Sequence, residues 1–362
     1  MEQPSTPAFD PAAPRPHAAL KRLVLRLAGI AIAVGLLYAT LRGTDADFLG
    51  SLKGASWPML FLAFLCISNS HFVGAWRWGC LLLVQGIRLP FLQLLRLTLI
   101  GVFFSAVIPG TVSGDVIKMA YATRAAPQKG MEAAFTVALD RLIGLAGLFA
   151  VAVLASLAML WRYPQLLSEH PVVSLGLLAV WAGAAAFAGA YLAIMARTWV
   201  MRHQTVRSVA NRLAAWLPPR LLRLILKMVA AVDLYKSNQA ILLKTLLQSM
   251  FVHAMLGVAV FLVGRAFREQ AMTLLQYMLA TQVGNATGVI PLTPGGIGLR
   301  EAVTAALFTA FEAQPATIVA TIPIANTIIA TVWTLVGAAA WVFKSNPATT
   351  KTPSARAHPK PK

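Results

Sequence analysis

Long apolar runs alternate with short polar stretches along almost the whole chain. Several of these runs are about 20 residues long, which is the length that an α-helix needs to cross a membrane. A soluble domain of this size would need many more polar positions to cover its core. The pattern therefore predicts an all-α polytopic membrane protein. The candidate segments are Leu23–Leu41, Trp57–Trp76, Phe91–Ile108, Ala133–Leu160, Val172–Ala196, Leu242–Gly264, Ala271–Ile290, Ile297–Phe311 and Ala316–Phe343.

The same helix-breaking motif interrupts the apolar pattern twice. Residues 105–118 read S-A-V-I-P-G-T-V-S-G-D-V-I-K, and residues 287–300 read T-G-V-I-P-L-T-P-G-G-I-G-L-R. Both contain I-P-x-T-x-x-G, followed four residues later by a cation, Lys118 or Arg300. Proline withholds a backbone donor and glycine permits close approach, so each motif predicts a turn. The expected turn residues are Pro109, Gly110, Gly114, Pro291, Pro294, Gly295, Gly296 and Gly298.

The distribution of positive charge predicts how these segments cross the membrane. Lys21, Arg22 and the basic stretch 197–239 belong on the cytoplasmic side by the positive-inside rule. Five single crossings before that stretch would place it outside, so Phe91–Tyr121 is predicted to be a hairpin that enters and leaves from the cytoplasm. Ala271–Phe311 would enter from the opposite side as a second hairpin. Two short full crossings in its place would leave the later segments on the same sides of the membrane.

The predicted fold class is therefore an inverted repeat of about six full transmembrane helices plus two re-entrant helical hairpins, counted as about eight hydrophobic segments. Both termini would be cytoplasmic. Residues 1–20 are predicted to form a disordered tail, 21–345 the membrane domain, and 346–362 a disordered basic tail. Within the membrane domain, 197–239 is either an amphipathic interfacial helix or an ordinary basic loop.

Composition and charge fit this class. The chain is 58% hydrophobic and 12% charged, and its net charge is +19. On a soluble protein that excess would suggest nucleic acid. Here the cations lie between apolar runs, so we expect anionic membrane lipids as partners and no nucleic acid. Neither catalytic motifs nor metal-ligand spacings are present in the sequence, which predicts a protein without cofactor or bound metal that is not an enzyme.

Charged side chains next to the motifs are the candidate binding residues, because ionisable groups inside a span are costly. A helix that restarts after Gly114 or Gly296 directs free amides inward, which suits a phosphate. Lys118, Arg141 and Arg300 would supply full positive charges. Lys118 is alternatively a positive-inside residue of the loop.

The acidic candidates have structural alternatives. Glu301 either serves the site or only fixes the second hairpin together with Arg300. Asp115 either caps the restarted helix or carries a proton. Asp140 either forms a structural ion pair or belongs to the site.

Three further polar residues lie within or next to apolar segments. Arg77, between Trp76 and Trp78, is interpreted as an anchor at the membrane interface. His71 and His253 are interpreted as packed histidines.

Four runs in order, A-W-R-W-G-C-L-L-L-V-Q-G, V-I-P-G-T-V-S-G-D-V-I-K, A-L-D-R-L-I-G-L and I-P-L-T-P-G-G-I-G-L-R-E-A, resemble the lysylphosphatidylglycerol synthase transmembrane-region family. The resemblance covers about residues 20–345, and it extends to the flippase half of the bacterial multiple-peptide-resistance factor. Lys118 stands where Arg is more usual in the family. The matching residues are Pro109, Gly114, Asp115, Lys118, Asp140, Arg141, Pro291, Gly295, Gly296, Gly298, Arg300 and Glu301.

The resemblance implies lipid handling rather than one particular lipid. The family's best-known member moves an aminoacylated phospholipid that a fused soluble domain makes, and other relatives are associated with polyprenyl-linked sugars and hopanoids. We expect this chain to be a stand-alone member without the synthase domain. A separate lipid-modifying synthase is then a possible partner.

The leading hypothesis is a lipid flippase or transporter of the bacterial inner membrane. It would move an anionic phospholipid, or a polyprenyl- or lipid-linked head group, between leaflets. Two alternatives stay open. One is an intramembrane transferase acting on a lipid-linked sugar or phosphate, with Asp140 or Glu301 as its base. The other is a membrane scaffold for a partner synthase.

Overall fold

The computed structural model describes residues 46–108, 113–162, 171–200, 203, 208, 232–288, 298–313 and 318–343. This part of the chain is helical and contains no strand. Five of its helices are long and apolar enough to cross a membrane, which confirms an all-α polytopic membrane protein. They are α3 (Trp57–Val84), α6 (Gly130–Arg162), α8 (Pro171–Val200), α11 (Gln239–Ala266) and α14 (Thr321–Val342).

Several predictions concern residues outside the described ranges. The predicted first span, Leu23–Leu41, and the two predicted tails lie outside the described residues, so a total of six full spans stays a prediction. Most of the basic stretch 197–239 also lies outside them, although α8 continues as helix to Val200.

Both motif-bearing segments fold as pairs of short helices that pack against each other. Their turn residues Pro109, Gly110, Pro291, Pro294, Gly295 and Gly296 lie outside the described residues. The first pair is α4 (Phe91–Val107) and α5 (Ser113–Ala125), and the second is α12 (Leu274–Thr287) and α13 (Leu299–Ala310). We call them the first and second hairpins. The remaining short elements are α2 (Ala46–Lys53) and a 3₁₀ turn, η1 (Pro127–Lys129).

A glycine lies where the two arms of each hairpin approach. A Cβ at Gly114 would overlap the Gly101 carbonyl oxygen and the Ser105 hydroxyl of the opposite arm. A Cβ at Gly284 would overlap the Thr304 hydroxyl and would lie 3.2 Å from the Arg300 carbonyl oxygen. The lack of a side chain is what allows the arms to lie this close.

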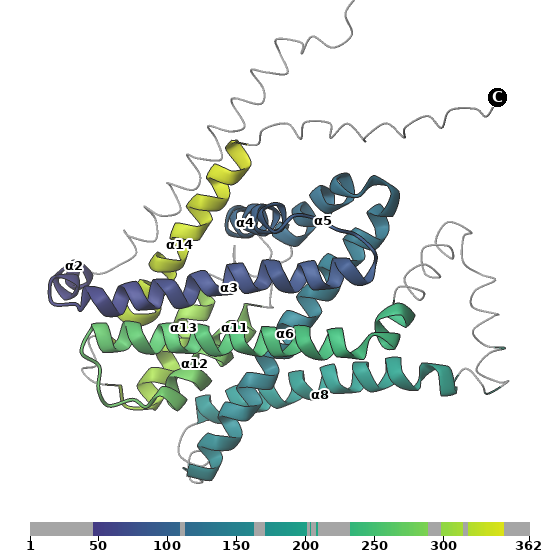
Figure 1. Ribbon diagram of the computed structural model, residues 1–362. Coiled ribbons are helices and arrows are strands. Elements are labelled where there is room, and N and C mark those ends of the chain that lie inside the picture. The colour runs from purple at the N-terminus through teal and green to yellow at the C-terminus, as the bar shows by residue number, and fades with distance from the viewer. Residues whose placement is uncertain are drawn as a thin grey trace, which may run out of the picture.

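The long helices α3 and α11 run side by side and separate the first arms of the two hairpins (Figure 1). α4 packs against α3, and α12 packs against α11. α6 contacts both α5 and α12, so it links the first hairpin to the second. α14 packs along α4 and also touches α11. The hairpins are thus held around a common set of long helices.

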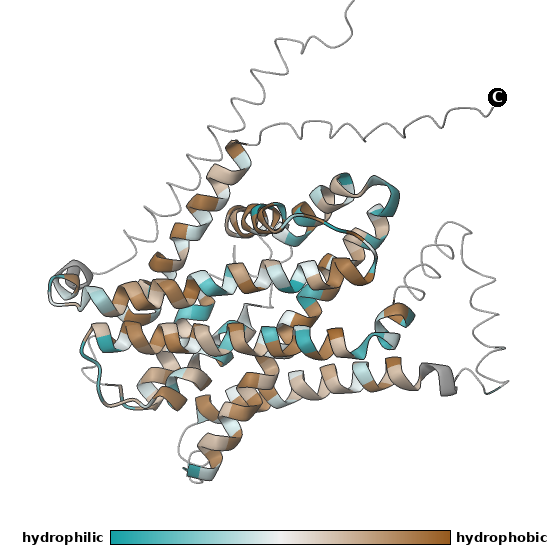
Figure 2. Cartoon of the chain, in the orientation of Figure 1, coloured by the Kyte–Doolittle hydropathy of each residue, from teal (hydrophilic) through white to brown (hydrophobic). Residues whose placement is uncertain are grey.

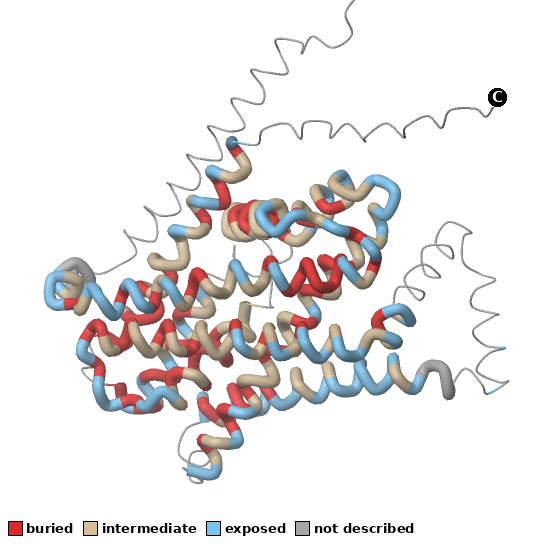
Figure 3. The backbone as a smooth tube through the Cα atoms, in the orientation of Figure 1, coloured by how far each residue is buried: buried red, intermediate tan, exposed pale blue. Residues whose placement is uncertain are grey.

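The surface of the helices is apolar and part of the interior is charged. Hydrophobic residues dominate the long helices in Figure 2, and the outer half of α8 is largely exposed in Figure 3. Buried residues include Arg77, Lys118, Asp140 and Glu301. Exposed apolar side chains suit lipid, whereas buried charges need partners inside the protein.

One predicted boundary is wrong, and so is the interpretation of Arg77 beside it. The second apolar segment was predicted to end at Trp76, with Arg77 at the interface, yet α3 continues to Val84. Arg77 is only 9% exposed and pairs with Asp140 of α6. Because Asp140 of α6 compensates the charge of Arg77, α3 can carry this residue in its interior.

The second hairpin begins at a tightly bonded turn after α11. The buried Glu269 carboxylate accepts from the Met272 amide and the Tyr277 hydroxyl, both at 2.8 Å. Arg265 donates from Nη2 to the Met272 carbonyl at 2.9 Å. Thr273 and Gln276 then form a capping box that starts α12. These bonds fix the direction in which the hairpin leaves α11.

Candidate functional site

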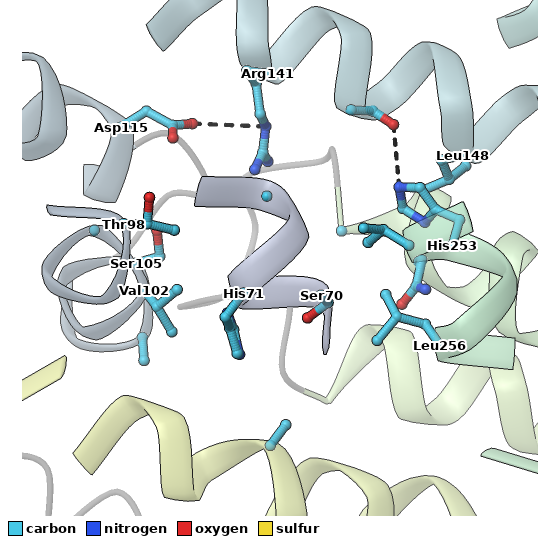
Figure 4. A pocket seen from close by; sticks show the side chains of 18 of the residues that line it. Ser70, His71, Thr98, Val102, Ser105, Asp115, Arg141, Leu148, His253 and Leu256 are labelled. Carbon is cyan, nitrogen blue, oxygen red and sulfur yellow. Dashed lines mark hydrogen bonds and ion pairs between the residues drawn. The ribbon is translucent and has the colours of Figure 1, made fainter. Parts of the chain in front are cut away.

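A cavity of about 480 Å³ lies between the two hairpins and the long helices. Its lining comes from α3, α4, α5, α6, α11, α12, α13 and α14. Figure 4 shows it from close by, with Arg141 and Asp115 facing each other on one side and His253 on another. Both repeated motifs therefore contribute to one space.

At the first hairpin, Asp140 of α6 binds two cations. Arg77 donates from Nε to Asp140 Oδ1 at 2.8 Å and from Nη2 to the Asp140 carbonyl at 3.2 Å. Lys118 Nζ lies 3.5 Å from Asp140 Oδ2. All three side chains are buried. The network joins α3, α5 and α6. Each carboxylate oxygen of Asp140 lies beside one of the two cations.

Lys118 is held by an aromatic ring as well. Its Nζ lies 4.1 Å from the ring centroid of Trp78, which is within the range of a cation–π interaction. Trp78 is itself fixed, because its Nε1 donates to Thr136 Oγ1 at 3.0 Å. With 5% of its surface exposed, Lys118 is committed to internal partners.

Arg141 is the most accessible cation of this cluster. Its side chain is 41% exposed, and its Nε lies 3.7 Å from Asp115 Oδ2, an ion-pair distance too long for a hydrogen bond. Within the described part of the chain, Asp115 Oδ2 accepts no hydrogen bond although that atom is buried. Asp115 lies in the first turn of α5. Arg141 is therefore available to an anion in the cavity.

At the second hairpin the charges neutralise each other locally. Gly298 has φ +93°, a conformation that favours glycine, and its amide donates to Glu301 Oε2 at 2.6 Å. Arg300 donates to Glu301 Oε1 from Nε at 3.0 Å and from Nη2 at 2.6 Å. The Thr327 hydroxyl also donates to Oε1, and it accepts from Arg300 Nη2 at 2.8 Å. Glu301 thus both fixes the start of α13 and holds Arg300.

The structure brings the predicted site residues together. Glu301 lines a smaller cavity of about 20 Å³ that Arg300 also borders. Gly114 lies at the crossing of the first hairpin and Gly298 at the start of α13. The main cavity is lined by the other five predicted binding residues: Asp115, Lys118, Asp140, Arg141 and Arg300.

Much of the remaining lining is hydroxylated. Thr327, Thr331 and Thr334 are spaced by four and three residues, which places them on one face of α14, and all three line the cavity. Ser70 of α3 lines it as well. The sequence reading missed this face. Its signal was the helical spacing of threonines within an otherwise apolar segment.

His253 of α11 presents one nitrogen without a partner. Its Nε2 lies 3.1 Å from the Gly144 carbonyl oxygen of α6, so that nitrogen carries the proton and donates. The Ser249 hydroxyl donates to the same carbonyl at 3.1 Å. Nδ1 accepts no hydrogen bond from the described residues. His253 lines the cavity, but Nδ1 itself is buried and stays an unpaired acceptor inside the protein.

Among the residues that the structure describes, no three His, Cys, Asp or Glu side chains are grouped as they would be around a metal ion. The arrangement suits an anion held by guanidinium and ammonium groups, with hydroxyls beside it. The family model described as lysylphosphatidylglycerol synthase TM region matches residues 26–337 of the chain. No curated protein matches the chain.

Proposed function

The chain belongs to the lysylphosphatidylglycerol synthase TM region family, and on that premise we propose that it is a lipid flippase of the bacterial inner membrane. It would move an anionic phospholipid, or a polyprenyl- or lipid-linked head group, between the two leaflets. Its termini would be cytoplasmic, as the basic stretches at both ends favour.

One observation carries the proposal: cations from both motifs, including Lys118 and Arg300, line a single cavity. Its volume of about 480 Å³ lies within the range of pockets that hold small molecules. The apolar outer surface of the helices would leave lipid tails in the bilayer while the head group occupies the cavity. That division is what moving a lipid across a membrane requires.

The hairpins provide the means of exposing that cavity to each leaflet. We propose that they are re-entrant and enter from opposite leaflets as an inverted repeat. α4 and α5 have 17 and 13 residues, and α12 and α13 have 14 and 12. A helix rises about 1.5 Å per residue, so none of the four covers a hydrocarbon core about 30 Å thick.

Labelling of single cysteines tests this arrangement. The native Cys66 and Cys80 are first replaced by serine. Ala106→Cys in the first hairpin and Thr287→Cys in the second are then treated with a membrane-impermeant maleimide on inside-out and right-side-out vesicles. We expect the first to react from the cytoplasmic side and the second from the opposite side. Reaction of both from the same compartment would exclude an inverted repeat.

Transport is favoured over the transferase alternative by the state of the two candidate bases. Asp140 holds Arg77 and Lys118, and Glu301 accepts from Gly298, Arg300 and Thr327. Each oxygen of the two carboxylates already lies beside an internal donor or cation, which leaves fewer lone pairs for a substrate proton. A radiolabelled lipid recovered chemically unchanged after incubation with the purified protein is the expected result. A new labelled product would instead support the transferase.

Reconstitution into vesicles tests the site itself. The loss of a fluorescent anionic lipid to an external quencher measures its movement between leaflets. Arg300→Ala removes a cation of the cavity and leaves Glu301 unpaired, so we expect the rate to fall by about tenfold or more. Lys244→Ala, which removes an exposed lysine of α11, is the matched control and should keep the wild-type rate. An unchanged rate in Arg300→Ala would argue strongly against the cavity as the path, and it is also what a scaffold predicts.

A further inference from the structure

The formal charges around the two cavities do not cancel. Four cations line them in the described part of the chain, Arg77, Lys118, Arg141 and Arg300. Three carboxylates oppose them, those of Asp115, Asp140 and Glu301. Among the described residues, one positive charge is therefore left over. Residues 109–112 and 289–297, which lie outside the described residues, contain no charged residue in the sequence.

The excess charge belongs to the first-hairpin end. There Arg77, Lys118 and Arg141 face two aspartates, whereas Arg300 and Glu301 form a neutral pair. Of the three cations, Arg77 and Lys118 are buried against Asp140, and Arg141 has only the 3.7 Å contact to Asp115. A single anionic group entering the cavity would therefore pair with Arg141.

A positive charge on the ligand would add to the net positive charge of the lining. Both oxygens of Asp140 and of Glu301 are occupied by internal donors. Asp115 is the remaining carboxylate, and it already lies beside Arg141. An ammonium group carried into the cavity would lose hydration, would have to share Asp115 with Arg141, and would leave the excess charge uncompensated, which is unfavourable.

Hydroxyl groups, by contrast, find acceptors on the α14 side. Thr331 Oγ1 donates to the Thr327 carbonyl at 2.8 Å, which leaves its lone pairs open to a donor from the cavity. Thr334 and Ser70 line the same space.

From these observations we propose that the ligand is a monoanionic lipid with one phosphodiester, which pairs with Arg141, and an uncharged head group that carries hydroxyls. The hydroxyls would lie on Thr331. This rests on the proposed function and specifies its substrate class. Lipids with a cationic or zwitterionic head group, and lipids with two phosphates, are disfavoured by the same charge count.

Four lipids built from the same acyl chain test the proposal. Phosphatidylglycerol has one negative charge and two head-group hydroxyls. Phosphatidylmethanol keeps the charge and has no hydroxyl, so its comparison with phosphatidylglycerol tests the hydroxyls. Phosphatidylethanolamine has an ammonium and no hydroxyl, so its comparison with phosphatidylmethanol tests the added charge. Cardiolipin has two phosphates, one hydroxyl and four acyl chains. The full-length protein in detergent is incubated with an equimolar mixture, and native mass spectrometry measures which lipid is retained. We expect phosphatidylglycerol to exceed phosphatidylethanolamine and cardiolipin by about tenfold, the effect of one unpaired buried charge or amine.

Two variants separate the parts of the proposal. The wild type should also prefer phosphatidylmethanol to phosphatidylethanolamine; Arg141→Gln should abolish this preference, and Arg141→Lys should retain most of it. Thr331→Val should bring phosphatidylglycerol down to the level of phosphatidylmethanol without changing the latter. Equal or better retention of phosphatidylethanolamine by the wild type would overturn the charge assignment. Equal retention of phosphatidylglycerol and phosphatidylmethanol would overturn the hydroxyl assignment.

Parallel vesicle assays distinguish this inference from the proposed function. Selective binding of phosphatidylglycerol by a protein that moves none of the four lipids would contradict transport and leave the substrate class standing. Movement of all four at equal rates would support transport and contradict the substrate class.

Discussion

The two hairpins carry the same motif but hold their charges differently. Lys118 of the first hairpin reaches Asp140 on α6, where Arg77 of α3 also binds. Arg300 of the second hairpin binds its own neighbour, Glu301, and Thr327 of α14. The first cluster thus connects three helices and keeps a positive charge, whereas the second is local and neutral. One motif can therefore serve two purposes, depending on which partners the surrounding helices supply.

Removing the central carboxylate of each cluster tests this difference, and we expect the larger effect at the first hairpin. Asp140→Asn leaves Arg77 and Lys118 buried with no counter-charge, which should cost about 3–5 kcal/mol of stability. Glu301→Gln keeps an oxygen for the Gly298 amide and leaves only Arg300 unpaired, so about 1–3 kcal/mol is expected. Thermal unfolding in detergent measures both.

Lys53→Ala in α2 serves as the control for these unfolding measurements, since it removes an exposed charge. A loss of stability as large in Glu301→Gln as in Asp140→Asn would show that the second cluster is not local.

The arm crossings give a smaller test of the same comparison. An alanine at Gly114 meets the backbone carbonyl of Gly101, which cannot move without shifting α4. An alanine at Gly284 mainly meets the Thr304 hydroxyl, a side-chain atom that can rotate. We expect Gly114→Ala to cost about 1–3 kcal/mol and Gly284→Ala about 1 kcal/mol or less. The unfolding midpoints of the two variants check the order, and the reverse order would mean that the second hairpin is the more rigid of the two.

Local features of the sequence predicted the two interruptions that separate the paired short helices, whereas their re-entrant placement stays a prediction. Proline and glycine close together interrupt a helix, and a cation one turn after the motif's last glycine lies on the helix that restarts there. The partner of Arg77 could not be predicted in this way. It lies 63 residues away on another helix, and neither hydrophobic period nor spacing specifies which helices pack together. Without that partner, the flanking tryptophans favoured the interpretation of Arg77 as an anchor at the membrane interface.

The hydroxyl groups that line the cavity could not be predicted from the sequence either, because a threonine in a membrane helix commonly bonds its own backbone. Thr331 does so, to the carbonyl of Thr327. Only the arrangement of α14 against α4 and α11 shows that the threonine face is turned toward the cavity.

The carbonyl of Gly144 has a mechanical consequence. Ser249 and His253 both bond to it, one turn of α11 apart, and so they pin α11 to α6 at the level of the cavity. Sliding of one helix past the other would break both hydrogen bonds at once, so we expect α6 and α11 to keep their relative position at this level in any rearrangement of the protein.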